Sequence, residues 1–387
     1  MRSSQMTILM IGPLPPPYSG PEISMKLFMD SELKDNFHLL FLKTNFRKNN
    51  VDKGKNDLAA AFFTLGYFFK LLFFLVFRRP DVAYYPVTPT AGGWLLRDAP
   101  TLLLCRLFGI KSIIHLRGSH FRRNYGTFPQ WIKKIAARAI RGVSMALVQA
   151  DYLHEEFADF LPPEKIRTLY QAIDSVNFPP DPAAEKTGMI LIVGHLTQAK
   201  GYCDMLRVIP LVAAECPEAQ FYFAGNIRHG ERGVFFNQAT GERLVYEDPI
   251  DAEQEFLKSP WAGHYHRLGI IAGDEKLKCF QETSVFVMPS YSEGFSRALL
   301  EALCTGKAIV YTPVGAHREI MLDGVNGIRV MPGDVENFAR AIVRLLKESS
   351  ERRQMGVHNA EDARKRFDIH VIVRQLSLFF TEVGGQK

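Results

Sequence analysis

The sequence predicts an α/β fold of two doubly wound, parallel-sheet domains of similar size. Three observations predict it. Short apolar runs alternate with helix-like segments along nearly the whole chain, which is typical of parallel sheets covered by helices on both faces. The alternation breaks once, at the Pro- and charge-rich stretch Asn177–Gly188, which we interpret as an interdomain linker. The length of 387 residues is enough for two domains.

Each expected strand is a short run of β-branched, aliphatic and aromatic residues. The first series is Thr7–Ile11, Phe37–Leu42, Val82–Tyr85, Ser112–Leu116 and Met145–Val148. The second series is Met189–Val193, Gln220–Ala224, Val285–Met288, Ala308–Tyr311 and Gly327–Val330. Helical patterns between them include Ile23–Leu33, Trp131–Ile140 and Asp204–Cys216. Ligands bind beyond the carboxyl ends of such strands, so we expect functional residues in the turns that follow them, facing a cleft between the domains.

Composition indicates an ordinary folded protein. Hydrophobic residues make up 47%, charged residues 23%, and the formal net charge is +6, a mild excess whose clustering matters more than its size. The five cysteines are scattered without a C-x-x-C pair, which argues against a disulfide framework or zinc site and suits a reducing compartment. Thr7–Ile11 lacks the layout of a signal peptide, so we expect a cytoplasmic protein.

The segment Ala59–Phe77 is almost wholly apolar and aromatic, with Lys70 as its one charge. Its length approaches that of a transmembrane helix, but a spanning helix would separate the first two strands from the rest of their sheet. A second alternative is a buried crossover helix. A third is a helix whose aromatic face contacts a bilayer interface, which would give peripheral membrane contact through 59–79. The basic residues near it are Arg47, Lys48, Lys53, Lys55, Arg78 and Arg79.

A second basic run could extend that surface or simply lie on solvated helix faces. It consists of Arg117, Arg122, Arg123, Lys133, Lys134, Arg138 and Arg141. We do not expect nucleic acid as a partner, because the sequence has no recognised nucleic-acid motif and the charge excess is modest.

Two glutamates lie eight positions apart where an apolar strand becomes a helix. Glu293 is expected in the turn and Glu301 about one turn into a helix that begins near Arg297. Between them lie the backbone N–H groups of Gly294, Phe295 and Ser296. Such N–H groups suit an anion or a sugar hydroxyl, and two carboxylates suit the hydroxyls of a sugar and a ribose. The alternative is a capped helix start with two surface glutamates.

Two other strand-to-helix turns suit a diphosphate. Gly20 before Pro21 starts a helix without a side chain in the way, although the G-x-G-x-x-G fingerprint is absent. His195 and Lys200 lie in the turn after the first strand of the second domain, where Lys200 would act as a point charge on phosphate oxygens. The alternatives are a Pro-rich turn and a surface lysine. Gly225 and Asn226 end the next strand and could line the same site.

His115 and Arg117 end a strand of the first domain beside Gly118 and His120, and a functional role and a structural role are both open for them. The stretch Asn226–Gly263 is long and polar for a connection. Lining of the acceptor site and a plain surface loop are both open for it.

In these segments the chain resembles glycosyltransferase family 4, the retaining nucleotide-sugar-dependent transferases of GT-B fold, over nearly its whole length. The most specific segment is the E-x7-E motif, here Glu293 and Glu301. The other matching segments are Ile173-Asp174 with Phe178, Gly194 with Lys200-Gly201, Gly225-Asn226, Gly315–Ile320 and Asn326-Gly327. We therefore expect an N-terminal Rossmann-like domain over 1–178, joined by a C-terminal helix over about 370–387, and a nucleotide-sugar-binding domain over 179–369.

The resemblance implies roles for individual residues. Glu301 would hold the nucleotide ribose and Glu293 the donor sugar, while Lys200 would bind the diphosphate and Gly20 would let it approach. No metal or other cofactor is implied, and the sequence lacks a D-x-D-type pair; Lys200 and helix N-termini would stabilise the leaving diphosphate. The catalytic candidates are Glu293, Lys200, His115 and Arg117. The donor-binding candidates are Gly20, His195, Lys200, Gly225, Asn226, Gly294, Phe295, Ser296 and Glu301.

Three positions depart from the family pattern. His195 stands where many relatives carry Arg, and Ser19-Gly20 where many have a Gly-Gly pair. Arg117 aligns with a common histidine, so either His115 substitutes for it or Arg117 contacts the donor itself.

The resemblance, together with the aromatic segment and the basic residues near it, implies a function. That function is sugar transfer, with retention, from a nucleotide-diphosphate donor to a glycolipid or polysaccharide acceptor at the cytoplasmic membrane face. The partners would be a nucleotide sugar and a glycan or lipid-linked glycan. One alternative keeps the fold but uses a soluble acceptor such as a sugar phosphate. Another is a GT-B protein that binds a nucleotide or glycan without turnover.

Overall fold

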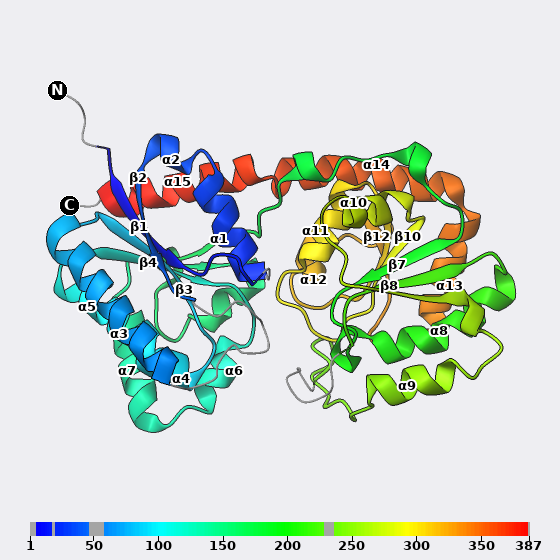
Figure 1. The fold of residues 1–387 in the computed structure, drawn as a ribbon, viewed down its shortest axis with the longest axis horizontal. Helices are drawn as coiled ribbons and strands as arrows, with labels where there is room; N and C mark the ends of the chain where they lie inside the picture. The colour runs from blue at the N-terminus through cyan, green and yellow to red at the C-terminus, as the bar shows by residue number, and fades with distance from the viewer. Residues whose placement is uncertain (1–4, 18–19, 46–57, 228–235, 386–387) are drawn as a thin grey trace. The chain divides into compact units, whose positions relative to one another are not determined.

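The computed structural model describes residues 5–17, 20–45, 58–227 and 236–385. The chain divides into two compact units (Figure 1). The N-terminal unit is Met1–Ala172 with Ile369–Lys387, and the C-terminal unit is Ile173–Asp368. Ser19, the basic residues at positions 47, 48, 53 and 55, and residues 228–235 lie outside the described ranges.

Each unit contains a six-stranded parallel sheet covered by helices, which confirms the predicted fold of two doubly wound parallel-sheet domains. The first sheet has the order β2-β1-β3-β4-β5-β6 and the second β12-β11-β10-β7-β8-β9. The first six strands are β1 (Thr7–Gly12), β2 (His38–Lys43), β3 (Val82–Val87), β4 (Lys111–Leu116), β5 (Met145–Val148) and β6 (Ile166–Thr168). The others are β7 (Met189–Val193), β8 (Gln220–Ala224), β9 (Tyr265–Gly269), β10 (Val285–Met288), β11 (Ala308–Tyr311) and β12 (Gly327–Arg329).

The helices fall between the strands, except for three that follow the last strand. Those of the N-terminal unit are α1 (Gly20–Asp30), α2 (Leu33–Asn36), α3 (Leu58–Phe73), α4 (Ala91–Gly93), α5 (Ala99–Leu107), α6 (Phe121–Gly126), α7 (Gln130–Ile140) and α15 (Ile369–Gly385). Those of the C-terminal unit are α8 (Tyr202–Glu215), α9 (Pro249–Phe256), α10 (Gly273–Glu282), α11 (Arg297–Cys304), α12 (His317–Ile320), α13 (Val335–Lys347) and α14 (Ser349–Arg366).

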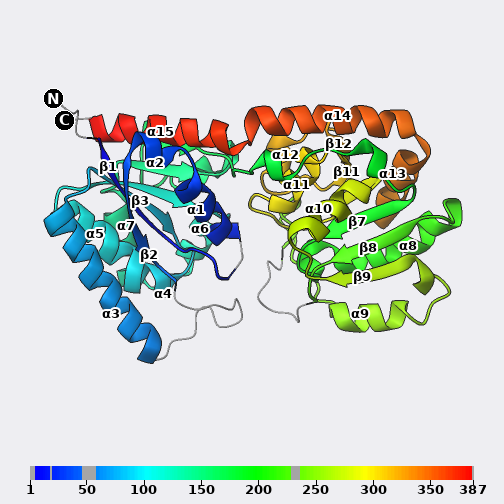
Figure 2. The same cartoon turned by 45° about the horizontal axis from the view of Figure 1, so that its top comes forward.

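The C-terminal helix α15 completes the core of the N-terminal unit. It packs against α1, α2 and β3 (Figures 1 and 2). Ile372, Leu376 and Phe380 are buried at four-residue spacing, as expected for one apolar face of a helix. The Phe380 ring lies edge-on to Tyr84 with centroids 6.1 Å apart. The last segment of the chain is therefore part of the first domain's core.

The change from the first unit to the second comes earlier in the sequence than the predicted boundary after residue 178. The Pro-rich stretch Asn177–Gly188 lies within the C-terminal unit and is tied to α10. Lys186 N–H donates to Glu282 O at 2.8 Å, and Gln281 Nε2 donates to Pro179 O at 3.0 Å. Its composition indicated a linker, but these hydrogen bonds fasten it to the second domain.

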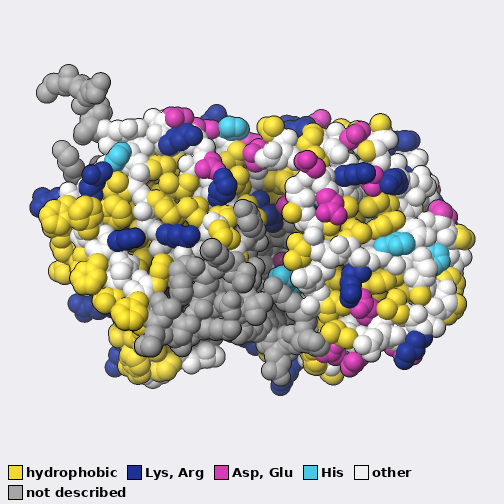
Figure 3. Space-filling view, in the orientation of Figure 1, with side chains coloured by type: hydrophobic (Ala, Val, Ile, Leu, Met, Phe, Trp, Pro, Cys, Tyr) yellow, Lys and Arg dark blue, Asp and Glu magenta, His cyan; other side chains and the backbone are white. Residues whose placement is uncertain are grey.

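The crossover helix α3 continues into a π-helical turn, Phe74–Arg78. The stretch Ala61–Arg78 is long and apolar enough, by length and composition, to cross a membrane, and 17% of it is buried. Hydrophobic side chains gather on this part of the N-terminal unit (Figure 3). The exposed ones include Phe62, Phe69 and Phe77, so the alternative of a buried crossover helix is wrong.

Candidate functional site

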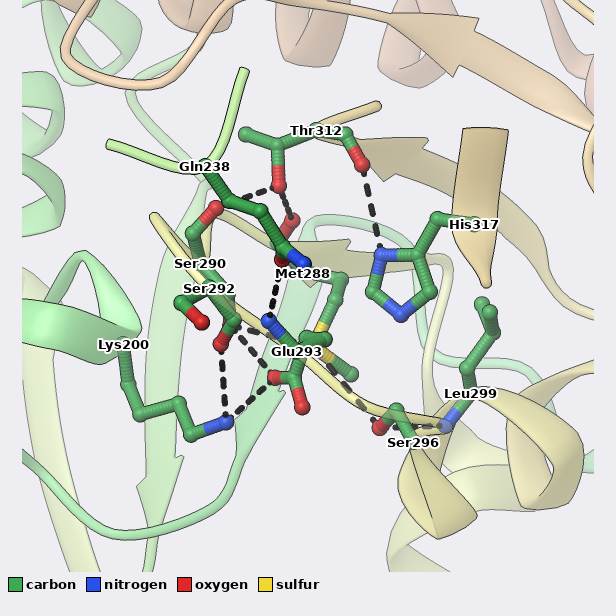
Figure 4. A network of polar contacts seen from close by, with 10 residues as sticks. All are labelled: Lys200, Gln238, Met288, Ser290, Ser292, Glu293, Ser296, Leu299, Thr312 and His317. Atoms are coloured by element: carbon green, nitrogen blue, oxygen red, sulfur yellow. Dashed lines mark hydrogen bonds and ion pairs between the residues drawn. The ribbon is translucent and has the colours of Figure 1, made fainter. Parts of the chain in front are cut away.

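The centre of the candidate site is an ion pair between Lys200 and Glu293 in the C-terminal unit. Lys200 lies in the turn between β7 and α8, and Glu293 lies in the turn between β10 and α11. Because β7 and β10 are adjacent parallel strands, their following turns meet at the carboxyl edge of the sheet. Lys200 Nζ lies 2.6 Å from Glu293 Oε1 (Figure 4). The two catalytic candidates of this unit are therefore in direct contact.

The turn that carries Glu293 is held on both sides by hydrogen bonds. Ser290 Oγ donates to Glu293 Oε1 at 2.7 Å, and Thr312 Oγ1 donates to Ser290 O at 2.6 Å. Glu293 N–H donates to Gln238 Oε1 at 3.1 Å. Lys200 Nζ also donates to Ser292 O at 3.4 Å. The carboxylate and the ammonium are thus oriented before any ligand binds.

Two glycines let the surrounding backbones approach this turn closely. Gly201, with φ of 71°, follows Lys200, and a Cβ built on it would lie 2.3 Å from Pro289 O. Gly315, with φ of 55°, would place a Cβ 2.3 Å from Glu293 O. Both positions combine a left-handed backbone with a contact that leaves no room for a side chain. The close approach of Lys200 and Glu293 therefore depends on both glycines.

The buried carboxyl of Glu293 is ionised by its neighbours. Burial alone would raise its pKa, but the Lys200 charge, the His317 ring and the two hydrogen bonds bring the pKa below its ordinary value. His317 is fully buried, and its Nδ1–H donates to Thr312 O at 3.2 Å. Burial lowers the pKa of His317, against the opposite effect of Glu293. A neutral His317 then leaves Nε2, which has no hydrogen-bond partner among the described residues, as an acceptor.

Acid should remove the stability that Glu293 contributes. Because its pKa is lower in the folded state than its ordinary value of 4.5, the contribution is complete above that value and is lost as the pH falls through the folded pKa. We expect Glu293→Gln to destabilise the chain most at neutral pH and progressively less below about pH 4.5. Urea unfolding of both proteins across this range measures the difference. A difference that stays constant with pH would contradict the ion pair.

Glu301 lies in α11 and is paired with Lys276 of α10. The Glu301 residue is 2% exposed. Lys276 Nζ lies 2.6 Å from Glu301 Oε2 and donates a hydrogen bond of 2.6 Å to Glu301 Oε1. Burial raises the pKa of Glu301, partly offset by the charges of Lys276 and Arg297. The alternative of two surface glutamates on a capped helix is therefore wrong for both positions, since Glu293 is 9% exposed.

The other predicted donor-binding residues of this unit lie on the same edge of the sheet. Leu196 N–H donates to Asn226 O at 3.1 Å, so the turn that carries the exposed His195 runs beside the turn of Gly225 and Asn226. In the turn before α11, the Phe295 ring packs against Phe367 with centroids 5.7 Å apart. Ser296 caps α11 by accepting a hydrogen bond from Leu299 N–H at 3.3 Å.

Gly294 connects this turn to the loop after β11. Its carbonyl accepts a hydrogen bond from Ala316 N–H at 3.0 Å. Since Phe295 and Ser296 use their side chains for packing and capping, the three residues can serve a ligand mainly through their backbone groups.

In the N-terminal unit, His115 and Arg117 are joined through Tyr84. Arg117 Nη2 donates to Tyr84 Oη at 3.0 Å, and Tyr84 Oη lies 2.6 Å from His115 Nδ1. Burial, with the Arg117 charge, holds the pKa of His115 well below its ordinary value, so the ring is neutral. His115 is 1% exposed, whereas Arg117 is half-buried and stacks over the Phe28 ring at 5.2 Å. Of the two candidates, Arg117 reaches the surface.

Gly20 begins α1, as the Gly-Pro pair predicted. A Cβ at this position would meet no atom within 4 Å, so the space beside it is open. The preceding Pro-rich loop is fastened by Asn45, whose side chain accepts from Leu14 N–H at 3.0 Å and donates to Pro16 O at 3.1 Å. Gly20 and the Lys200–Glu293 pair belong to different units.

The residues of the site that were not predicted from the sequence include His317, Lys276 and Gln238. His317 lies in the family-like segment Gly315–Ile320, and nothing in the sequence distinguishes Lys276 from other helix lysines. Gln238 belongs to the long stretch Asn226–Gly263. Its hydrogen bond to Glu293 shows that part of this stretch lies against the site.

Comparison with known proteins supports a glycosyltransferase relationship. Residues 187–348 match the family of glycosyl transferases group 1. An uncharacterized glycosyltransferase of Methanocaldococcus jannaschii is 28% identical over 213 residues, covering 52% of this chain and 49% of the relative. The N,N'-diacetylbacillosaminyl-diphospho-undecaprenol alpha-1,3-N-acetylgalactosaminyltransferase of Campylobacter jejuni is 32% identical over 134 residues, 34% of each chain. The chain spans about half the length of the archaeal relative and a third of the bacterial one.

The solved structures agree with the fold. The Anabaena protein HepE in complex with UDP matches with a TM-score of 0.71 at 14% identity, covering 97% of this chain and 100% of that one. The sequence match covers most of the C-terminal unit, and the structural match covers nearly the whole chain. The chain has the two-domain, Rossmann-like GT-B fold of these solved structures, and its C-terminal unit is similar to glycosyl transferases group 1.

Proposed function

We propose that the chain is a retaining glycosyltransferase of family 4 that transfers a sugar from a nucleoside-diphosphate donor to a glycolipid or growing polysaccharide. It acts at the cytoplasmic face of a membrane and needs no metal. The observation that carries the proposal is the ion pair of Lys200 with Glu293 at the carboxyl edge of the second sheet. There, one side chain suits a diphosphate and the other suits a sugar hydroxyl.

The E-x7-E pair divides the donor between two carboxylates. Glu293 addresses the donor sugar from its turn. Glu301 addresses the ribose from α11, where Lys276 is its ion-pair partner. An ionised carboxylate offers about four lone-pair sites and Lys276 uses few of them, so Glu301 retains the capacity to accept two hydroxyls.

The chemistry is charge stabilisation at the leaving group. The bond between the anomeric carbon and the diphosphate oxygen breaks, and the acceptor oxygen bonds to the anomeric carbon on the same face. The acceptor's hydroxyl proton passes to the departing phosphate oxygen. Lys200 neutralises charge that grows on the diphosphate, an interaction stronger in the transition state than in the ground state. Arg117, which Tyr84 and Phe28 hold in place, is a half-buried cation of the N-terminal unit.

The relatives support the choice of donor and acceptor. The structural neighbour HepE is in complex with UDP, and the Campylobacter relative is named for an acceptor carried on diphospho-undecaprenol. A nucleoside-diphosphate sugar and a lipid-linked glycan are therefore the substrate classes we assign to this chain.

A donor screen tests the proposal. We expect one nucleoside diphosphate and its sugar conjugate to raise the melting temperature by several degrees, because ligand at 100 times its Kd stabilises a fold by about 2.7 kcal/mol. That donor should support transfer to a lipid-linked glycan with an unchanged anomeric configuration, read by NMR, and with EDTA present. Nucleotide binding without transfer to any acceptor would favour the non-catalytic alternative, and transfer to sugar phosphates alone would favour a soluble acceptor. An inverted product would overturn retention.

A further inference from the structure

One face of the N-terminal unit carries a row of exposed aromatic and aliphatic side chains. On the inner side of α3 and its π-helical turn, Tyr67, Leu71 and Leu75 are buried against the unit, and Tyr67 Oη lies 2.9 Å from Thr101 Oγ1. Five residues on the outer side are each between 52% and 73% exposed. We call this row the aromatic ridge, and it consists of Phe62, Leu65, Phe69, Phe73 and Phe77. The spacing of three to four residues places them on one face of the helix.

A basic groove lies two helices away. The helix α3 packs on α5, and α5 packs on α7. A groove with a volume of about 670 Å³ is lined by the end of α5, by α6 and by α7. The cations that line it are Arg106, Lys133, Lys134, Arg138 and Arg141, and no carboxylate lines it. Within the described residues, none of these five cations forms an ion pair with Asp or Glu.

The sequence concentrates the net positive charge of the chain here. Between Asp98 and Asp151 there are nine Lys and Arg and no Asp or Glu. The chain has 47 basic and 41 acidic residues, so without these nine it has 38 basic residues and is slightly acidic. The residues Leu58–Pro80 likewise include Lys70, Arg78 and Arg79 but no acid. An ordinary solvated helix face interleaves both signs, whereas the lining of the groove has five cations and no carboxylate.

We propose that the aromatic ridge and the basic groove together bind the bilayer peripherally, with anionic phospholipid as the partner. The ridge enters the boundary between headgroups and acyl chains, and the groove holds headgroup phosphates. Positive charge beside exposed aromatic side chains is the complement of such a bilayer. Membrane binding by this surface rests on the proposed function in one respect: its role would be to hold the enzyme where a lipid-linked acceptor lies.

The structure favours a helix that lies on the bilayer over one that spans it. Only one side of α3 is free, since Tyr67, Leu71 and Leu75 are packed in the domain. The chain also returns at once into β3, which is hydrogen-bonded between β1 and β4. A spanning helix would remove β3 from the centre of its sheet.

Vesicle flotation of the full chain tests the proposal. The probes are vesicles of phosphatidylcholine alone and vesicles that also contain phosphatidylglycerol. The ridge variant is Phe62→Gln, Phe69→Gln and Phe77→Gln. The groove variant is Lys134→Gln, Arg138→Gln and Arg141→Gln. A matched control, Lys258→Gln, Lys278→Gln and Lys365→Gln, removes three charges from exposed lysines of the C-terminal unit.

We expect the wild type and the control to float with the anionic vesicles and to be released by high salt. Because each basic side chain near an anionic surface favours binding, removing three of them should lower the partition coefficient of the groove variant at least about tenfold. The ridge variant should lose as much. Circular dichroism and the nucleotide-induced melting shift should be unchanged in all variants, because none of these residues belongs to the candidate site.

Three outcomes would overturn the proposal. The first is a wild type that does not float, or ridge and groove variants that float as it does. The second is a chain that resists both salt and alkaline extraction, which indicates a spanning helix. The third is a dimer in light scattering that the ridge variant dissociates, without lipid binding, which indicates that a second copy covers the ridge. A wild type that binds no nucleotide would instead contradict the proposed function, without contradicting membrane binding by the ridge and the groove.

Discussion

Replacing Lys200 with alanine is expected to lower turnover by roughly 10²–10³-fold, the usual effect of removing one preorganised group at a developing charge. The physical reason is the position of Nζ, held by Glu293 Oε1 at 2.6 Å and Ser292 O at 3.4 Å at the edge where the diphosphate would lie. Initial rates at saturating donor measure the turnover, and calorimetric titration measures donor affinity separately. Lys200→Arg, which keeps the charge, should recover part of the activity.

A second role of Lys200 must be separated from the first. Its loss leaves the buried Glu293 carboxylate without its cation, which destabilises the turn whatever happens to the donor. The double variant Lys200→Ala, Glu293→Gln removes that buried charge. If Lys200 only neutralises Glu293, the double variant should recover both stability and turnover. We expect it to recover stability and remain inactive. Lys186→Ala, which breaks an exposed ion pair with Glu282, serves as the control for loss of a lysine.

The fold could be predicted from sequence because interior strands of a parallel sheet are almost entirely apolar. The strands β5, β7, β8, β10 and β11 begin and end at the predicted residues. The two strands that were not predicted, β6 and β9, are edge strands. β6 has only three residues, and β9 reads Tyr-His-Arg-Leu-Gly, in which polar side chains hide the strand pattern. The pattern of apolar residues in a sequence indicates which positions are buried. An edge strand is only partly buried, so its apolar pattern is weak.

The hydrophobic segment α3 shows a second limit of sequence reasoning. A helix that is apolar on every side has the same pattern whether its outer face meets protein, lipid or solvent. Only the three-dimensional structure shows that Tyr67, Leu71 and Leu75 are packed while Phe62 and Phe69 are exposed.

The residues of the site could be proposed singly, but their partners could not. Lys200 and Glu293 are 93 positions apart and meet only because β10 lies beside β7 in the sheet, an order that the chain does not reveal. His317 and Lys276 were missed for the same reason, since burial beside Glu293 and pairing with Glu301 are long-range properties. The resemblance supplied the roles of individual residues, and strand order supplies their contacts.

Replacing Glu301 with glutamine is expected to raise the Kd for the nucleoside diphosphate by roughly 10–100-fold, because hydrogen bonds to a charged group each contribute about 1.5–3 kcal/mol. The amide keeps the size of the side chain, so the buried position in α11 is not emptied. The control is Glu282→Gln, an acid of α10 that pairs with Lys186 and lies outside the proposed donor contacts. Calorimetric titration of each protein measures the Kd.

The ribose contact can be separated from a structural effect by changing the ligand as well as the protein. If Glu301 accepts the ribose hydroxyls, the wild type should bind 2′-deoxy and 3′-deoxy analogues more weakly than the parent nucleotide, and Glu301→Gln should discriminate little among the three. The two losses then fail to add, as expected for partners in one contact. A general disturbance through Lys276, whose ammonium loses its ion pair in the variant, would weaken all three ligands equally. Additive losses would therefore remove Glu301 from the ribose site and leave it as the buried partner of Lys276.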